Sequence, residues 1–174
     1  MRRSRSLLLG LGVPVLFFLA IQLVPYGRNH ARPPAGRRVV WDSPRTEELA
    51  RRSCFDCHSN ETRWPWYVKV APVSWFVATD VKRARKAVNF SEWSVQAGRT
   101  ANTAMGTLAA ACAGVTAGHM PPALYRLMHP EARLSEEEAI CFCTWTIEES
   151  RWLRAARPTL LRSRLGGADT EPRP

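Results

Sequence analysis

Two cysteines and a histidine in the first third of the chain have the spacing of a covalent haem site. Cys54, Cys57 and His58 form a C-x-x-C-H pattern, which is the arrangement that attaches c-type haem. Each thiol can add to one vinyl group of the porphyrin and form a thioether bond. The adjacent imidazole can then bind the iron through a neutral ring nitrogen. The motif therefore predicts one covalent haem c, with His58 as an iron ligand.

Paired cysteines also occur in zinc sites and in redox motifs. A zinc site needs a second pair of ligands, and the chain offers Cys141 and Cys143, whose separation by one residue is unusual for zinc. A zinc-stabilised interaction domain built on both cysteine pairs is thus the weaker alternative. A thioredoxin-like motif is weaker still, because no alternation of strand and helix patterns surrounds Cys54 and Cys57.

A haem iron held by His58 has a second axial position, for which the sequence offers several ligands. Thioether sulfur at that position raises the reduction potential, as expected for an electron carrier. Met120 is favoured because it lies in a non-helical stretch and precedes two prolines, which limit the freedom of the backbone. Met105 falls on a helical apolar stripe and suits a core position. The other candidates are His119, Met128 and His129, of which His119 is the main competitor.

The composition indicates which partners the protein suits. The chain has 174 residues, with 25 Lys and Arg against 15 Asp and Glu, which gives a formal net charge of +10. This balance suits an acidic redox partner or an anionic membrane surface. No nucleic-acid-binding motif is found, so nucleic acid is not expected as a partner. The tryptophan content indicates large aromatic surfaces, which suit a flat apolar cofactor as well as an ordinary core.

The first 25 residues predict a transmembrane anchor helix. Arg2, Arg3 and Arg5 precede an apolar stretch from Leu7 to Val24, which as a helix would rise about 27 Å, close to the thickness of a bilayer's hydrocarbon core. No small-residue cleavage site follows, so an uncleaved anchor is preferred to a signal segment. The leading arginines place the N-terminus in the cytoplasm. The haem domain is then expected to face the periplasm, on the side of the cytoplasmic membrane where c-type haem is attached.

The remaining sequence predicts an all-α domain at residues 41–156. An extended Arg- and Pro-rich linker is expected at 26–40 and a disordered basic tail at 157–174. A proline near a helix start, a capping box and apolar residues at helical spacing indicate the helices. They are expected from 43 into the haem motif, at 74–88, at 101–115 and at 135–152. Prolines between 60 and 72 predict an aromatic-rich loop there.

The helix expected at 74–88 has a basic face. Its cations are Lys82, Arg83, Arg85 and Lys86. Such a face is most often only a solvated surface. The more specific interpretation is a docking surface for an acidic redox partner, since complementary charge steers association.

Several segments occur in a characteristic order: CFDCHSNET (54–62), WPWY (64–67), NFSEW (89–93) and MPP (120–122), with Tyr125 and His129-Pro130. Together they resemble the bacterial haem-binding domain family of small c-type cytochromes. The resemblance covers about residues 40–152. It implies covalent haem on Cys54 and Cys57, iron ligation by His58, and Met120 as the second ligand. The physiological role of this family is less well defined than its fold.

Three further cysteines have no counterpart in the family pattern. They are Cys112, Cys141 and Cys143, and an oxidising compartment would leave one of three without a partner. The sequence does not decide whether any of them pair.

The sequence thus predicts a membrane-anchored, all-helical, monohaem c-type cytochrome domain that transfers single electrons. The main alternative is a haem-based sensor of small ligands, or a peroxidase-like enzyme, with an open or displaceable sixth site. No distal acid–base pair is recognisable, because His119 and His129 have no partners visible in the sequence. The carrier interpretation is therefore preferred to an enzyme.

Overall fold

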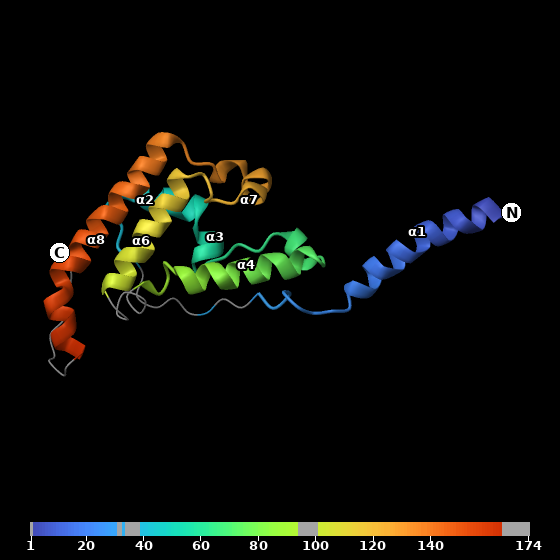
Figure 1. Ribbon diagram of the computed structural model, residues 1–174, viewed down its shortest axis with the longest axis horizontal. Coiled ribbons are helices and arrows are strands. Elements are labelled where there is room, and N and C mark those ends of the chain that lie inside the picture. Colours follow the sequence, from blue (N-terminus) through green and yellow to red (C-terminus); the bar gives the residue numbers. More distant parts are fainter. Residues whose placement is uncertain (1, 31–32, 34–38, 94–100, 165–174) are drawn as a thin grey trace.

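The protein is built from helices. The computed structural model describes residues 2–30, 33, 39–93 and 101–164 (Figure 1), and no strand occurs among them, which confirms the predicted all-α class. The helices, with their labels and bounds, are α1 (Arg2–Ile21), α2 (Pro44–Ser53), α3 (Phe55–His58), the 3₁₀ helix η1 (Trp66–Lys69), α4 (Val73–Ala87), α6 (Ala101–Thr116), α7 (Ala123–Met128), the 3₁₀ helix η2 (Pro130–Ala132) and α8 (Glu136–Arg164).

The helix that was predicted to run into the haem motif consists of two pieces. Pro44 occupies the first turn of α2, and the hydroxyl of Ser43 accepts a hydrogen bond from the backbone N–H of Thr46. This cap satisfies a donor that the helix start would otherwise leave free. The helix ends at Cys54, which has a non-helical conformation, and the short α3 then presents His58 at its last position.

Helices α6 and α8 pack side by side and enclose much of the core (Figure 1). A disulfide between Cys112 on α6 and Cys143 on α8 joins them, with 5.0 Å between the Cα atoms. Cys141 is free, and its sulfur lies 3.4 Å from the hydroxyl of Thr46. The pairing that the sequence left open therefore uses two of the three extra cysteines. The fully buried side chains at this interface include Leu108, Phe142, Trp145 and Leu153.

The last helix is longer than the sequence predicted. Its expected capping box is present: the Ser135 hydroxyl accepts from the N–H of Glu138, and the Glu138 carboxylate accepts from the N–H of Ser135. The helix was expected to end near Trp152, with a disordered tail from residue 157, but α8 continues to Arg164. Leu, Ala and Arg are frequent in this stretch and have high helix propensity. Residues 165–174 of the predicted tail lie outside the described residues.

The prediction of a transmembrane anchor is not supported. Helix α1 ends at Ile21, before the predicted end at Val24. Its apolar part, from Leu7 onward, would rise only about 22 Å, against roughly 30 Å for a hydrocarbon core. Within the part of the chain that the structure describes, no helix combines the length and the apolar character that crossing a bilayer needs.

The segment after α1 packs on the domain, although an extended linker was predicted from residue 26. The side-chain amide of Gln22 donates to the carbonyl oxygen of Ala71 (3.0 Å) and accepts from its N–H (2.9 Å). Gly27 has a φ of +76°, and a Cβ there would collide with the carbonyl oxygen of Ser74. The ring of His30 stacks on Trp64 at 4.3 Å. Residues 31–32 and 34–38 of the predicted linker lie outside the described residues.

Candidate functional site

All four residues that the sequence selected for haem binding line one cavity. It has a volume of about 640 Å³, within the usual range for small-molecule sites. Cys54, Cys57 and His58 reach it from α3 and the residue before it, and Met120 reaches it from the loop between α6 and α7. The walls are mostly apolar and contain many small residues, which leave room for a flat group. They include Ala84, Ala87 and Val88 near the end of α4, and Ala110, Ala111 and Gly114 on α6.

The imidazole of His58 is oriented by the end of α4. Its Nδ1 atom lies 3.2 Å from the carbonyl oxygen of Val88, the residue that caps the helix. A carbonyl can only accept, so Nδ1 carries the proton and donates it. Burial lowers the pKa of His58 from its ordinary value, which favours the neutral ring. Nε2 is then the unprotonated nitrogen, the form that binds metals, while the second nitrogen holds the ring in place.

The two thiols of the motif are free and partly buried. Burial is the main cause that raises the pKa of Cys54 to about 12 and that of Cys57 to about 11. They are not joined to each other, so both sulfurs are available to form a bond to a bound group. In the haem-free fold they are protonated thiols at neutral pH.

The loop that bears Met120 is held against the end of α6. Gly118 ends the helix with a φ of +71°, a conformation that glycine adopts without steric cost. The N–H groups of His119 and Met120 both donate to the carbonyl oxygen of Gly114, at 2.9 Å each. A Cβ on Gly114 would lie 3.5 Å from the Cγ of Met120. His119 also lines the cavity, so the structure leaves both residues as candidates for the second iron ligand.

The other three candidates for the second ligand do not line this cavity. Met105 packs against the core, as its position on a helical stripe predicted. Met128 is more than half exposed. His129 lies 2.8 Å by Nε2 from the hydroxyl of Tyr67 and 3.3 Å by Nδ1 from Glu131. Both of its ring nitrogens are therefore engaged in a separate cluster.

Sequence reasoning missed a buried polar group inside the haem motif. Asp56 stands between the two cysteines, and its carboxylate accepts hydrogen bonds from two residues. Arg63 donates its backbone N–H (3.0 Å) and two guanidinium N–H groups (3.2 Å each). Tyr125 donates its hydroxyl at 2.7 Å, and its side chain also lines the cavity. The family resemblance included Tyr125, but no local pattern links it to Asp56.

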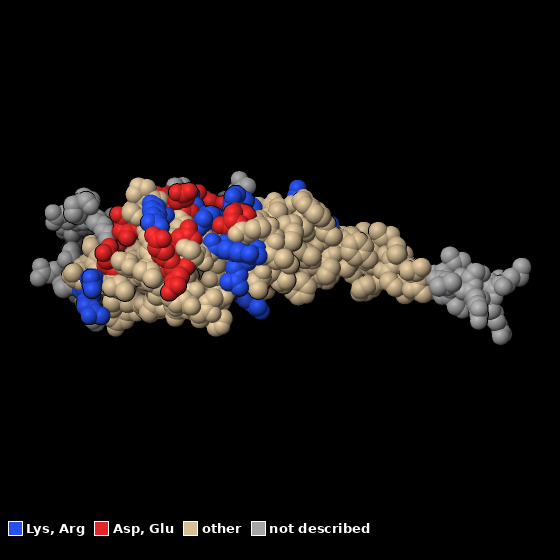
Figure 2. Space-filling model, turned by 90° about the horizontal axis from the view of Figure 1, so that it is seen from above, with Lys and Arg blue, Asp and Glu red and all other residues tan. Residues whose placement is uncertain are grey.

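The basic face of α4 divides into two parts. Arg85 donates to the carbonyl oxygen of Ser59 (2.7 Å) and to the hydroxyl of Thr62 (2.8 Å), so it ties α4 to the segment after the haem motif. Lys82, Arg83 and Lys86 are exposed, and Arg83 lies at the cavity. Figure 2 shows that acidic side chains lie among the basic ones on one face of the domain, so that face is not uniformly basic.

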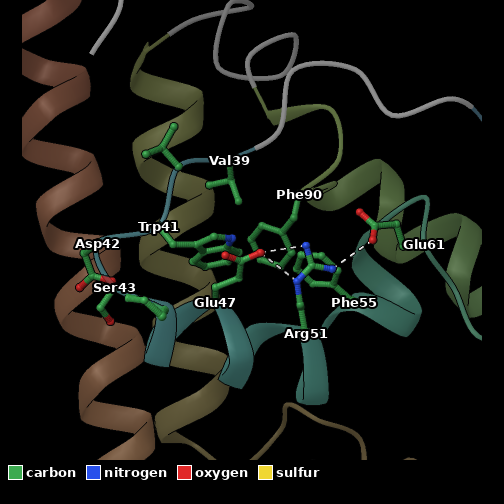
Figure 3. Close-up of a pocket in the computed structure, with 11 residues that line it drawn as sticks. Val39, Trp41, Asp42, Ser43, Glu47, Arg51, Phe55, Glu61 and Phe90 are labelled. Carbon is green, nitrogen blue, oxygen red and sulfur yellow. Dashed lines mark hydrogen bonds and ion pairs between the residues drawn. The ribbon is translucent and has the colours of Figure 1, made fainter. Parts of the chain in front are cut away.

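A second pocket, of about 390 Å³, contains none of the predicted site residues (Figure 3). Its aromatic wall consists of Trp41, Phe55 and Phe90. Arg51 crosses it and pairs with Glu47 at 2.8 Å and Glu61 at 3.0 Å. The guanidinium also lies 4.8 Å from the centre of the Phe55 ring. With Asp42, Glu47 and Glu61 against Arg51 among its lining residues, this pocket has an excess of negative charge.

The alternative of a zinc-stabilised domain is wrong. Cys143 is bonded to Cys112, so the proposed second pair of zinc ligands does not exist. Among the described residues, no group of three or more His, Cys, Asp or Glu side chains is arranged to hold a metal ion.

One comparison with known proteins gives a result. A model of the family described as haem-binding domain matches residues 16–148. No curated protein and no solved structure matches the chain.

Proposed function

The chain belongs to the haem-binding domain family and binds haem, and from this premise we propose that it is a c-type cytochrome that transfers single electrons. The observation that carries the proposal is the shared cavity of Cys54, Cys57, His58 and Met120. Two thiols, one neutral imidazole and one thioether are the side chains that covalent attachment and six-coordinate ligation of one haem require.

Attachment needs no oxidant. Cys54 and Cys57 would each hold the group through a thioether: the S–H bond would add across a vinyl double bond, with sulfur bonding to one carbon and the hydrogen to the other. His58 contributes an oriented Nε2, because its Nδ1–H is held by Val88. Met120 contributes a soft sulfur that favours the ferrous state. When bound, haem supplies an iron that gains or loses one electron, and the apolar walls keep water from it.

A partner surface is proposed on α7 and α4, which contribute Tyr125 and Arg83 to the lining of this cavity. On α7, Leu124, Leu127 and Met128 fall at helical spacing and are all more than half exposed. On α4, Lys82 and Arg83 provide exposed positive charge. Exposed apolar side chains together with exposed cations fit a redox protein whose own apolar patch has an acidic rim, because complementary charge accelerates encounter and apolar contact holds the complex.

We also propose that the domain works in the periplasm and that α1 acts as its export segment. The described apolar side chains of α1 are exposed, including Leu11, Leu16 and Phe17, and Figure 1 shows the helix projecting from the domain. A short apolar helix after basic residues is typical of an export signal. The Cys112–Cys143 disulfide supports an oxidising compartment.

A pyridine haemochrome spectrum of the denatured protein after acid–acetone extraction tests the central claim. We expect haem to stay with the polypeptide and to show the signature of two saturated vinyl groups. Extraction of all the haem into the acetone would refute covalent attachment, although haem binding itself would stand.

The second candidate function is a sensor or peroxidase-like enzyme with a displaceable ligand. It is favoured by the partial exposure of Met120, a residue that is 43% exposed. Rapid binding of carbon monoxide by the wild-type ferrous protein would support it over electron transfer.

A further inference from the structure

We propose that Tyr125 is a positioning residue for the second iron ligand, because its hydrogen bond to Asp56 holds the Met120 loop at the haem cavity. This inference rests on the proposed function in one respect, namely that Met120 ligates the iron. The anchoring itself is a property of the fold.

Asp56 is a strong anchoring point. It is buried, with 8% of its surface exposed, and lies between the two cysteines that would carry the haem. The Arg63 guanidinium neutralises its charge and donates to both carboxylate oxygens at 3.2 Å, and Oδ2 also accepts from the Tyr125 hydroxyl at 2.7 Å. Hydrogen bonds to a carboxylate are shorter and stronger than those between neutral groups. A displacement of Tyr125 would therefore leave a buried carboxylate with one donor fewer.

Helix α7 has little else to hold it. None of its residues is buried, and Leu124 and Leu127 are 79% and 67% exposed. Tyr125 is the α7 residue whose side chain enters the cavity wall. Its ring also stacks on His129 at 4.4 Å, and His129 is bound in turn to Tyr67. The hydroxyl and the ring of Tyr125 thus connect α7 to the haem motif and to η1.

The anchor acts on Met120 because the intervening chain is stiff. Two prolines separate Met120 from α7, and each restricts its own φ angle. The carbonyl oxygen of Pro122 accepts from the N–H of Arg126 at 3.0 Å. The guanidinium of Arg126 donates to the carbonyl oxygen of Gly118 at 3.2 Å. Residues 118–126 are therefore linked by hydrogen bonds among themselves. The backbone bonds to Gly114 fix one end of this segment, and the side chain of Tyr125 fixes the other.

The Tyr125 hydroxyl remains a hydrogen-bond donor across the physiological pH range. Burial and the hydrogen bond to Asp56 raise the pKa of Tyr125 above its ordinary value, so the hydroxyl keeps its proton. A phenylalanine at this position would preserve the ring and its stacking on His129, and would remove only the bond to Asp56.

The test compares Tyr125→Phe with wild type in the full-length haem protein. We expect amide hydrogen exchange at residues 119–128 to become roughly threefold to tenfold faster, the size of change that loss of one hydrogen bond produces. The sulfur-to-iron charge-transfer band should weaken and carbon monoxide should bind faster. Tyr26→Phe is the matched control: it removes a tyrosine hydroxyl that bonds Thr79 away from the cavity, and should leave residues 119–128 unchanged.

Asp56→Asn is the second variant. It retains an oxygen that can accept from Tyr125 but removes the charge, so exchange at residues 119–128 should rise less than in Tyr125→Phe. Unchanged exchange in Tyr125→Phe would overturn the proposal. A wild-type protein without the sulfur band would instead refute Met120 ligation in the proposed function, and the exchange rates would still decide whether Tyr125 is the anchor.

Discussion

The Nδ1 atom of His58 lies 3.2 Å from the carbonyl oxygen of Val88, at the point where α4 ends. A helix end has carbonyl groups without intrahelical partners, so the imidazole and the helix satisfy each other. The bond selects the tautomer with a free Nε2 and aims the ring from one wall of the cavity. The fold itself thus holds the His58 ring in place, and under the proposed function the group at the second axial position distinguishes a carrier from a catalyst.

The first prediction concerns that group. Met120→Ala should abolish the weak near-infrared sulfur-to-iron band of the oxidised protein, lower the reduction potential and admit carbon monoxide, because a soft ligand is lost. Absorption spectra and redox titration measure these changes.

Met105→Ala and Met128→Ala are the controls for this prediction. The first should keep the band and lose about 2 kcal/mol of stability, since Met105 packs on the core. Met128→Ala should change neither the band nor the stability, because Met128 is exposed. If His119→Ala removed the spectral signature of the sixth ligand while Met120→Ala did not, histidine would be the ligand and the potential would be low.

The second prediction concerns covalent attachment. Replacing Cys54 or Cys57 by serine should leave haem held by one thioether, and replacing both should leave none. Haem staining on a denaturing gel reports the bond directly. Cys141→Ser is the matched control, since Cys141 is also a free cysteine but does not line the haem cavity. Full staining of the double variant would show that the thiols are not the attachment points.

The third prediction is a pH dependence of the haem-free protein. Burial raises the pKa of Cys54 to about 12 and of Cys57 to about 11, from 9.0 in an unfolded chain. Below 9.0 both thiols are protonated in the folded and unfolded states, and their contribution to stability is fully present. As the pH rises through 9.0 the unfolded chain loses protons first, so the free energy of unfolding falls.

Denaturant titrations at neutral pH and about one unit above the unfolded pKa measure this loss. The Cys54→Ala/Cys57→Ala variant should lose less stability over the same interval. An equal loss in both proteins would mean that other groups cause it.

The fourth prediction concerns the disulfide between α6 and α8. Cys112 and Cys143 are 31 residues apart in sequence, and a loop of this length corresponds to about 3–4 kcal/mol in the chain-entropy model. The Cys112→Ser/Cys143→Ser variant should lose roughly that amount in denaturant unfolding. Cys141→Ser, on the same helix, should lose far less. Insensitivity of the wild-type protein to reductant would argue that the disulfide does not contribute in solution.

The part of the candidate site that is formed by a short sequence motif was predictable from the sequence. Cys54, Cys57 and His58 follow one another at a fixed spacing, and the prolines after Met120 indicate a constrained loop. The family match confirms the haem-binding assignment, and the described helices confirm the all-α class. The motif and the helix patterns both depend on residues that are close in sequence, so a single sequence is enough to reveal them.

The relationships between distant residues were not predictable. Asp56 and Tyr125 meet only because α7 folds back onto the haem motif, and nothing at either position indicates the other. The pairing of Cys112 with Cys143 likewise depends on the register between α6 and α8. The transmembrane prediction failed for a related reason, because it counted apolar residues without knowing that the helix ends at Ile21.

The contact between Gln22 and Ala71 has a practical consequence for recombinant production. Composition alone suggests truncating the chain at Trp41, but that cut would remove both hydrogen bonds that the Gln22 side chain makes with the backbone of Ala71. It would also uncover the face of Trp64 on which His30 stacks. A shortened protein of this kind would carry a new apolar surface and a tendency to aggregate. The family match, which begins at residue 16, includes the segment that carries Gln22 and His30. An expression boundary upstream of Gln22 keeps the domain whole.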